Sequence, residues 1–140
     1  MKLLVIGDKA RTEKHLPDMP VVDKVDIVVA ARGTSDAELL ELAADADFII
    51  NTTPCGMFPH PDAAPLDLSR LPACAGVLDL IYNPPVTLLM RQARERGIPA
   101  FNGLYMLVAQ ARRSAELFTG QPIPEERTEE IFLQLSGEEY

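Results

Sequence analysis

Five short apolar runs recur along the 140-residue chain, and the segments between them are long enough to cross over a sheet. The runs lie at residues 2–6, 25–30, 48–51, 77–82 and 98–101. Continuous rather than alternating apolar character is typical of parallel strands that are covered on both faces. The sequence therefore predicts one α/β domain over residues 1–140, a three-layer α/β/α sandwich of Rossmann-like or flavodoxin-like type with about five parallel strands.

Helix signals fill most of the intervals between these runs. Ser35 and Glu38 form a capping box, and glycines at positions 97 and 120 are typical of residues just past a helix end. Residues 52–75 hold five prolines and predict an ordered surface loop with one helical turn at 68–71. The expected helices span residues 9–16, 35–46, 84–96, 102–119 and 125–135. The strand order stays open between 2-1-3-4-5 and 3-2-1-4-5, because only the crossover geometry decides it.

Composition excludes several classes of function. The net charge of −8 argues against nucleic acid or an anionic membrane as a partner, because phosphate binding draws on clustered Lys and Arg. The apolar runs are too short for a membrane span or a signal peptide, so we expect a cytoplasmic protein. Cys55 and Cys74 predict reduced packing residues, not a disulfide framework. His15 and His60 are isolated, and no Cys or His spacing indicates a metal site.

Three motifs follow one another in the second half of the chain: Asn-Thr-Thr-Pro-Cys-Gly-Met at 51–57, Leu-Asp-Leu-Ile-Tyr-Asn-Pro-Pro at 78–85 and Phe-Asn-Gly-Leu-Tyr-Met at 101–106. Over about residues 51–135 they resemble the NADP-binding C-terminal domain of shikimate dehydrogenases. The resemblance implies NADP as the cofactor and shikimate as the substrate. It assigns Thr53 and Pro54 to the cofactor groove, Ile81, Gly103 and Met106 to the nicotinamide, Tyr82 and Gln110 to the shikimate hydroxyls, and Arg32 to the adenosine 2′-phosphate.

The chain departs from that family after its first apolar run. A glycine-rich turn is expected there, whereas the chain reads Gly7-Asp8-Lys-Ala-Arg-Thr and places a negative charge where the phosphates would lie. We therefore expect NADP binding to be weak or absent. The resembled family takes its catalytic Lys/Asp pair from a substrate domain that the motifs do not include, and no other catalytic constellation is present, so no catalytic residue is assigned.

Residues 1–50 resemble a different family, the D-2-hydroxyacid dehydrogenases, at their flavodoxin-like start. The likeness rests on residues 1–18, 31–40 and 46–50. The combination is interpreted as a chimera joined near residues 45–51, a stable scaffold with no turnover of its own. The alternative to a chimera is a natural, truncated and diverged relative of shikimate dehydrogenase. For the function, the alternatives are a shikimate-dehydrogenase-like oxidoreductase that uses NADP and a flavodoxin-like binding or interaction module.

Self-association is a further expectation. Without a substrate domain, apolar side chains near the C-terminus would lack cover, and a symmetric dimer is the commonest way to close such a surface. The sequence therefore predicts a homodimer through Leu104, Tyr105, Ile131, Phe132 and Leu135.

Overall fold

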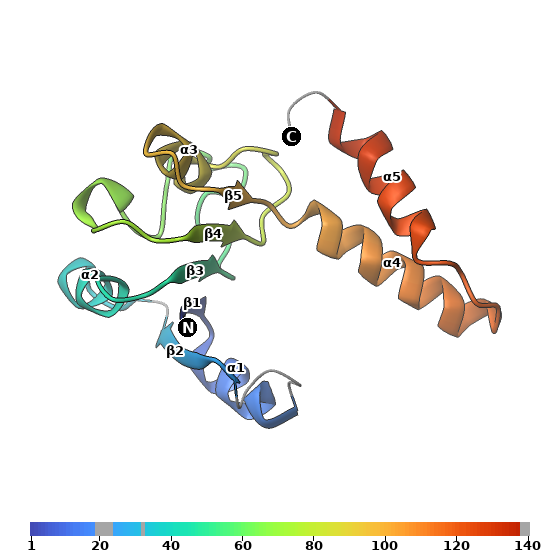
Figure 1. Cartoon of the computed structure of the whole chain (residues 1–140), viewed down its shortest axis with the longest axis horizontal. Coiled ribbons are helices and arrows are strands. Elements are labelled where there is room, and N and C mark those ends of the chain that lie inside the picture. The colour runs from blue at the N-terminus through green and yellow to red at the C-terminus, as the bar shows by residue number, and fades with distance from the viewer. Residues whose placement is uncertain (19–23, 32, 138–140) are drawn as a thin grey trace.

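A five-stranded parallel sheet with strand order β2-β1-β3-β4-β5 organises the protein (Figure 1). The computed structural model describes residues 1–18, 24–31 and 33–137. The strands are β1 (Lys2–Gly7), β2 (Asp26–Ala31), β3 (Phe48–Asn51), β4 (Gly76–Asp79) and β5 (Ala100–Phe101). The predicted α/β fold is confirmed, and the order is the first of the two alternatives. A Rossmann sheet has the strand order 3-2-1-4-5-6. Without its third strand the order becomes 2-1-3-4-5 after renumbering, so the observed order also fits a Rossmann-like sheet.

The helices lie close to their expected positions. They are α1 (Lys9–His15), α2 (Asp36–Ala43), α3 (Leu88–Glu95), α4 (Leu104–Thr119) and α5 (Glu126–Ser136), with short 3-10 turns η1 (Leu16–Asp18) and η3 (Leu68–Arg70). Among the described residues, no helix combines the length and the apolar character that a membrane crossing requires.

Two predicted boundaries around the second motif were wrong. β4 ends at Asp79 and not at Tyr82, because the Asp79 carboxylate accepts a hydrogen bond from the Ile81 backbone N–H and turns the chain. The next helix does not start at the proline pair. Thr87 is its N-cap, and its hydroxyl accepts from the Met90 N–H at 3.3 Å. A helix start is set by such a cap, so the prolines at 84 and 85 lie in the preceding turn.

The two faces of the sheet are covered unequally. Leu4, Ile49 and Val77 are buried together with Leu89 of α3 and Leu39 of α2, so α2 and α3 pack on one face. Right-handed crossovers in opposite directions place α1 on the other face, where it buries none of its own residues. The third layer is therefore thin. An apolar groove of about 440 Å³ remains on that face; it is lined by strand residues that include Leu3, Phe48, Ile50, Leu78 and Phe101.

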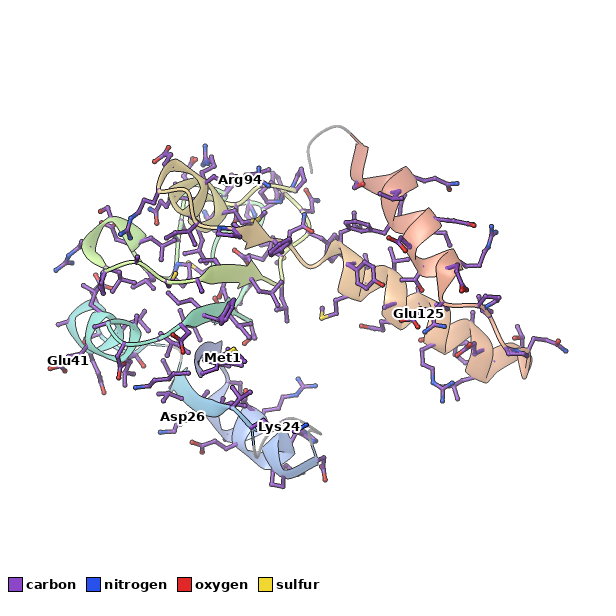
Figure 2. The ribbon with its side chains drawn as sticks, viewed as in Figure 1. Met1, Lys24, Asp26, Glu41, Arg94 and Glu125 are labelled. Carbon is purple, nitrogen blue, oxygen red and sulfur yellow. The ribbon has the colours of Figure 1, made fainter. Side chains whose placement is uncertain are left out.

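Helices α4 and α5 form a hairpin that leads away from the carboxyl end of β5 (Figure 1). Figure 2 labels Glu125, which precedes α5 at the turn of this hairpin. The turn is tied back to α4, because Ile123 donates its N–H to Glu116 Oε1 at 2.9 Å and its carbonyl accepts from Arg112 at 2.9 Å. At the other end of the hairpin, the rings of Tyr105 and Phe132 meet edge to face at 5.4 Å.

Candidate functional site: a cleft at the carboxyl edge of the sheet

The carboxyl ends of β1, β2, β3 and β4 border two adjoining cavities. The larger, about 540 Å³, lies against Ile6 and Ala31, where β1 and β2 end. The other, about 470 Å³, lies against Ile81 and the residues that follow β4. Both are lined by Thr53, Pro54, Met57 and Phe58, so the two cavities adjoin along this turn and are together called the cleft. Between β1 and β3 the chain reverses its direction across the sheet, and ligands of open α/β sheets bind at such a switch point.

The turn after β3 is held by its own side chains. Asn51 is fully buried, and its Oδ1 accepts from the Thr53 N–H at 3.0 Å and from the Thr53 hydroxyl at 2.7 Å. The Cys55 N–H donates in turn to Thr53 Oγ1 at 3.2 Å. Gly56 has a φ of 101°, and a Cβ there would lie 2.9 Å from the Ala63 carbonyl oxygen. The backbone of residues 51–57 is thus fixed before any ligand arrives.

The turn after β4 is built around the buried carboxylate of Asp79. Its Oδ1 accepts from Asn51 Nδ2 at 3.1 Å and from the Ile81 N–H at 3.2 Å, and its Oδ2 accepts from the Thr87 hydroxyl at 2.8 Å. Burial raises the pKa of Asp79, because desolvation outweighs these hydrogen bonds. The residue has no exposed surface, so it is placed to support the cleft and not to act on a ligand as a general base.

The third motif, at residues 101–106, packs against the end of the second motif, at residues 78–85. A Cβ on Gly103 would lie 1.9 Å from the carbonyl oxygen of Leu80, so only glycine lets α4 start this close to the end of β4. The Gly103 N–H donates to the Ile81 carbonyl at 3.1 Å. Asn102 donates through Nδ2 to the Pro85 carbonyl at 2.8 Å, and its Oδ1 accepts from the Leu104 N–H at 3.0 Å. All three motifs therefore meet at one edge of the sheet.

No glycine-rich turn follows β1. The Asp8 carboxylate accepts from the Arg11 N–H at 3.0 Å and so occupies the start of α1 itself. A Cβ on Gly7 would lie 1.9 Å from Thr52 Oγ1, and that hydroxyl donates to the Ile6 carbonyl at 2.9 Å. A side chain at position 7 would therefore displace the Thr52 hydroxyl from this hydrogen bond.

The residues expected to contact a ligand do not all lie at the cleft. Thr53, Pro54, Ile81 and Tyr82 line the cleft. Gly103 lies behind it, against Leu80. Met106 and Gln110 are exposed on α4 and do not line it, because α4 leads away from the sheet. Arg32 lies outside the described residues.

Sequence reasoning missed Phe58, which lines both cavities directly after the first motif. The signal in the sequence was an aromatic residue directly after the motif and before a proline. Cys55 also lines the larger cavity, and burial together with the nearby Asp79 raises the pKa of its thiol. Within the described part of the chain, no group of three metal-binding side chains is placed to hold an ion.

Comparison with known proteins identifies the relatives of this chain. The model of the family described as the shikimate 5'-dehydrogenase C-terminal domain matches residues 103–131. The shikimate dehydrogenase (NADP(+)) of Methanosarcina mazei is 37% identical over 113 residues, which make up 81% of this chain and 40% of that protein. The enzyme of the same name from Thermosynechococcus vestitus is 49% identical over 84 residues, 58% of this chain and 29% of that protein.

Solved structures show the same likeness over nearly the whole chain. A chorismate mutase/shikimate 5-dehydrogenase fusion protein from Clostridium acetobutylicum matches with a TM-score of 0.73 and 34% identity, over 93% of this chain and 52% of that one. Shikimate dehydrogenase 1 from Peptoclostridium difficile matches with a TM-score of 0.78 and 28% identity, over 97% and 54%. A shikimate dehydrogenase in complex with NADP⁺ matches with a TM-score of 0.68 and 25% identity, over 95% and 54%.

These alignments also bear on the predicted join near residues 45–51. Residues 51–140 cannot supply 81% of the chain, so the similarity to shikimate dehydrogenase reaches into the N-terminal 50 residues. The predicted D-2-hydroxyacid dehydrogenase start and the chimera therefore gain no support. The chain spans 29% and 40% of the two curated relatives above and about half of the solved ones. The chain is thus similar to part of the shikimate dehydrogenases and shares the Rossmann-like fold of the solved ones, with the match to their C-terminal domain at residues 103–131.

Proposed function

We propose that this domain binds NADP(H) along the two adjoining cavities of the cleft, as the cofactor-binding part of a shikimate-dehydrogenase-like oxidoreductase. The observation that carries the proposal is the position of the cleft at the switch point of the sheet, lined by Thr53, Pro54 and Ile81. The names of the curated relatives and the NADP⁺ complex of one solved relative support it.

The two halves of the cleft suit the two ends of a dinucleotide. The half at the ends of β1 and β2, beside Gly33 and Thr34, would take the adenosine end. The half beside Ile81 and Tyr82 would take the nicotinamide. A bound cofactor would supply hydride transfer to or from the carbon that carries the substrate hydroxyl. Tyr82 is 49% exposed at that end and would hydrogen-bond a substrate hydroxyl.

This chain would bind and orient the cofactor, while the proton transfer would need acid–base groups that residues 1–140 do not supply. A general acid or base must lie within hydrogen-bond reach of the reacting hydroxyl. All four lysines of the chain lie within its first 24 residues, and the carboxylate of Asp79 is fully buried. We therefore propose that residues 1–140 by themselves do not turn over shikimate.

Affinity for the cofactor should be low, because Asp8 stands where the pyrophosphate would lie. Its carboxylate already accepts from a helix-start amide, and it repels a second anion. A dissociation constant near millimolar, worth only about 4 kcal/mol, is expected.

Binding is tested by titrating NADPH into the purified chain by calorimetry and by nicotinamide fluorescence. The wild type should saturate at about millimolar NADPH. Met57→Glu, which puts a carboxylate into the region shared by both cavities, should abolish saturation. The matched control is Leu117→Glu, at a position 70% exposed on α4 that does not line the cleft, and it should bind like the wild type. Equal binding by wild type and Met57→Glu would contradict the proposed site.

Turnover is tested by following NADPH absorbance during incubation with shikimate and NADP⁺. No protein-dependent rise is expected from residues 1–140. A rate that scales with protein concentration and survives repurification would show that the chain carries its own acid–base groups.

A further inference from the structure

A chain of buried hydrogen bonds joins the turns on either side of the cleft to the start of α3. Asn51 ends β3, Asp79 ends β4, and Thr87 caps α3. The Asp79 carboxylate lies in the middle, with Asn51 Nδ2 at 3.1 Å from one oxygen and the Thr87 hydroxyl at 2.8 Å from the other. All three residues are 0–1% exposed. Three segments that are distant in sequence are thus connected through one carboxylate.

This arrangement is costly for fold stability alone. A buried carboxylate is usually paired with a cation, whereas the hydrogen bonds to Asp79 come from an amide, a hydroxyl and a backbone N–H, all neutral. Natural proteins keep such local conflicts mainly at functional sites. Here the carboxylate, together with the Leu80 N–H bond to the Asn51 carbonyl at 3.0 Å, holds the turn at 51–57 beside the turn at 79–83, and residues of both turns line one cavity of the cleft.

We propose that Asn51, Asp79 and Thr87 are positioning residues that hold the two turns of the cleft at the spacing a bound cofactor requires. The ligand in this statement rests on the proposed function, whereas the fixed spacing rests on the geometry alone. None of the three residues lines the cleft, so each acts through the backbone of Thr53, Cys55 and Ile81.

The chain offers a matched control for Thr87. Thr128 on α5 is also 1% exposed, but its hydroxyl has no hydrogen-bond partner in the described part of the chain. Replacing either threonine by valine removes one buried hydroxyl at nearly constant volume. Only Thr87→Val also removes a hydrogen bond to Asp79. Thr87→Ser keeps that bond and serves as the conservative rescue.

Hydrogen exchange provides the readout that needs no ligand. The amides of Thr53, Cys55 and Ile81 donate to side chains of this network or to Thr53, which the network holds. Thr87→Val should speed their exchange about tenfold relative to the Leu39 amide in α2, the effect of losing one hydrogen bond to a charged group. Thr87→Ser and Thr128→Val should leave unchanged the ratio of these three exchange rates to the rate of the Leu39 amide. Asp79→Asn, which leaves the Thr87 cap in place, should raise this ratio, as Thr87→Val does.

The NADPH titration separates this proposal from the proposed function. If the wild type binds NADPH, Thr87→Val should weaken binding about tenfold, and Thr87→Ser should restore it. If the wild type does not bind but the exchange ratio rises in Thr87→Val, the proposed function fails and the positioning role stands. An unchanged ratio in both Thr87→Val and Asp79→Asn overturns the positioning role, as does an equal acceleration of the Leu39 amide. Where Thr87→Val does not fold, Asp79→Asn decides.

Discussion

Asp8, directly after β1, is the residue that we expect to weaken cofactor binding most. It accepts the Arg11 N–H at the start of α1, where a phosphate-binding turn would leave that group free. Asp8→Asn removes the charge and keeps an oxygen for the same hydrogen bond. We expect NADPH to bind about fivefold more tightly, since one charge contact at the surface is worth about 1 kcal/mol.

Calorimetric titration at two salt concentrations checks this prediction. The gain should shrink at high salt, because ions screen exposed charges. Glu95→Gln at the end of α3, an exposed position that lines neither cavity, is the control and should leave the affinity unchanged. Equal affinities of Asp8→Asn and wild type would show that Asp8 does not oppose the pyrophosphate.

Asp79 gives a pH dependence with a defined sign. Burial raises its pKa above the usual value of 3.8, so the folded protein holds this proton more tightly than the unfolded chain does. Its contribution to stability is present at pH values below 3.8 and is lost as the pH rises through the folded pKa. Asp79→Asn lacks this loss. The stability of Asp79→Asn relative to wild type should therefore increase as the pH rises through that window.

Urea unfolding of both proteins across the acid range measures the difference. Other carboxylates titrate in both proteins and cancel in the comparison. A relative stability of Asp79→Asn that falls with rising pH would mean that the folded pKa of Asp79 is lowered.

Elements were predictable where periodicity alone defines them. Residues 48–51 were expected as a strand and form β3, because the run is apolar and bounded by a polar turn. The end of β4 and the start of α3 were not predictable. Both are set by hydrogen bonds of Asp79 with residues two and eight positions further along, which no hydrophobic pattern records. The resemblance to a family predicted which motifs form the cleft, but not that Met106 and Gln110 leave it with α4.

The start of α4 depends on the absence of a side chain at Gly103. A methyl group there would lie 1.9 Å from the Leu80 carbonyl oxygen, a backbone atom that cannot move without shifting the end of β4. Gly103→Ala should therefore destabilise the protein by about 1–3 kcal/mol, as overpacking does. It should also weaken NADPH binding, because Ile81, the residue after Leu80, lines the cleft and would move with it.

Gly120→Ala is the comparison for this prediction, measured by urea unfolding. Its new methyl group would meet no atom within 4 Å, but its φ of 66° disfavours alanine by about 1 kcal/mol. Gly120→Ala should leave NADPH binding unchanged. A loss of stability in Gly103→Ala no larger than in Gly120→Ala would show that α4 can shift without disturbing β4.

At the scale of the whole molecule, the sequence left two features open. The strand order depends on the direction of each crossover, which apolar runs do not encode. The position of the α4–α5 hairpin was also beyond reach, because its periodicity is that of any amphipathic helix pair. Leu104, expected at an exposed surface, is 8% exposed and packs at the base of the hairpin.

The hairpin nevertheless leaves an apolar surface uncovered, and self-association is the expected consequence. Of the residues predicted at the interface, Tyr105, Ile131 and Leu135 are 44%, 39% and 61% exposed, whereas Phe132 is partly covered by Tyr105. Large apolar patches are uncommon on soluble monomers, and a symmetric dimer buries the same patch twice. The net charge of −8 opposes unlimited aggregation, which favours a closed dimer.

Light scattering coupled to size exclusion tests this expectation and locates the interface. The wild type should have the mass of a dimer at high micromolar concentration, and Leu135→Glu should have that of a monomer, because a carboxylate would be buried without a partner. Phe101→Glu places the same charge on the apolar groove of the sheet and should leave the dimer intact. A dimer that only Phe101→Glu dissociates would place the interface on the open sheet face. A monomeric wild type would mean that the hairpin needs no cover.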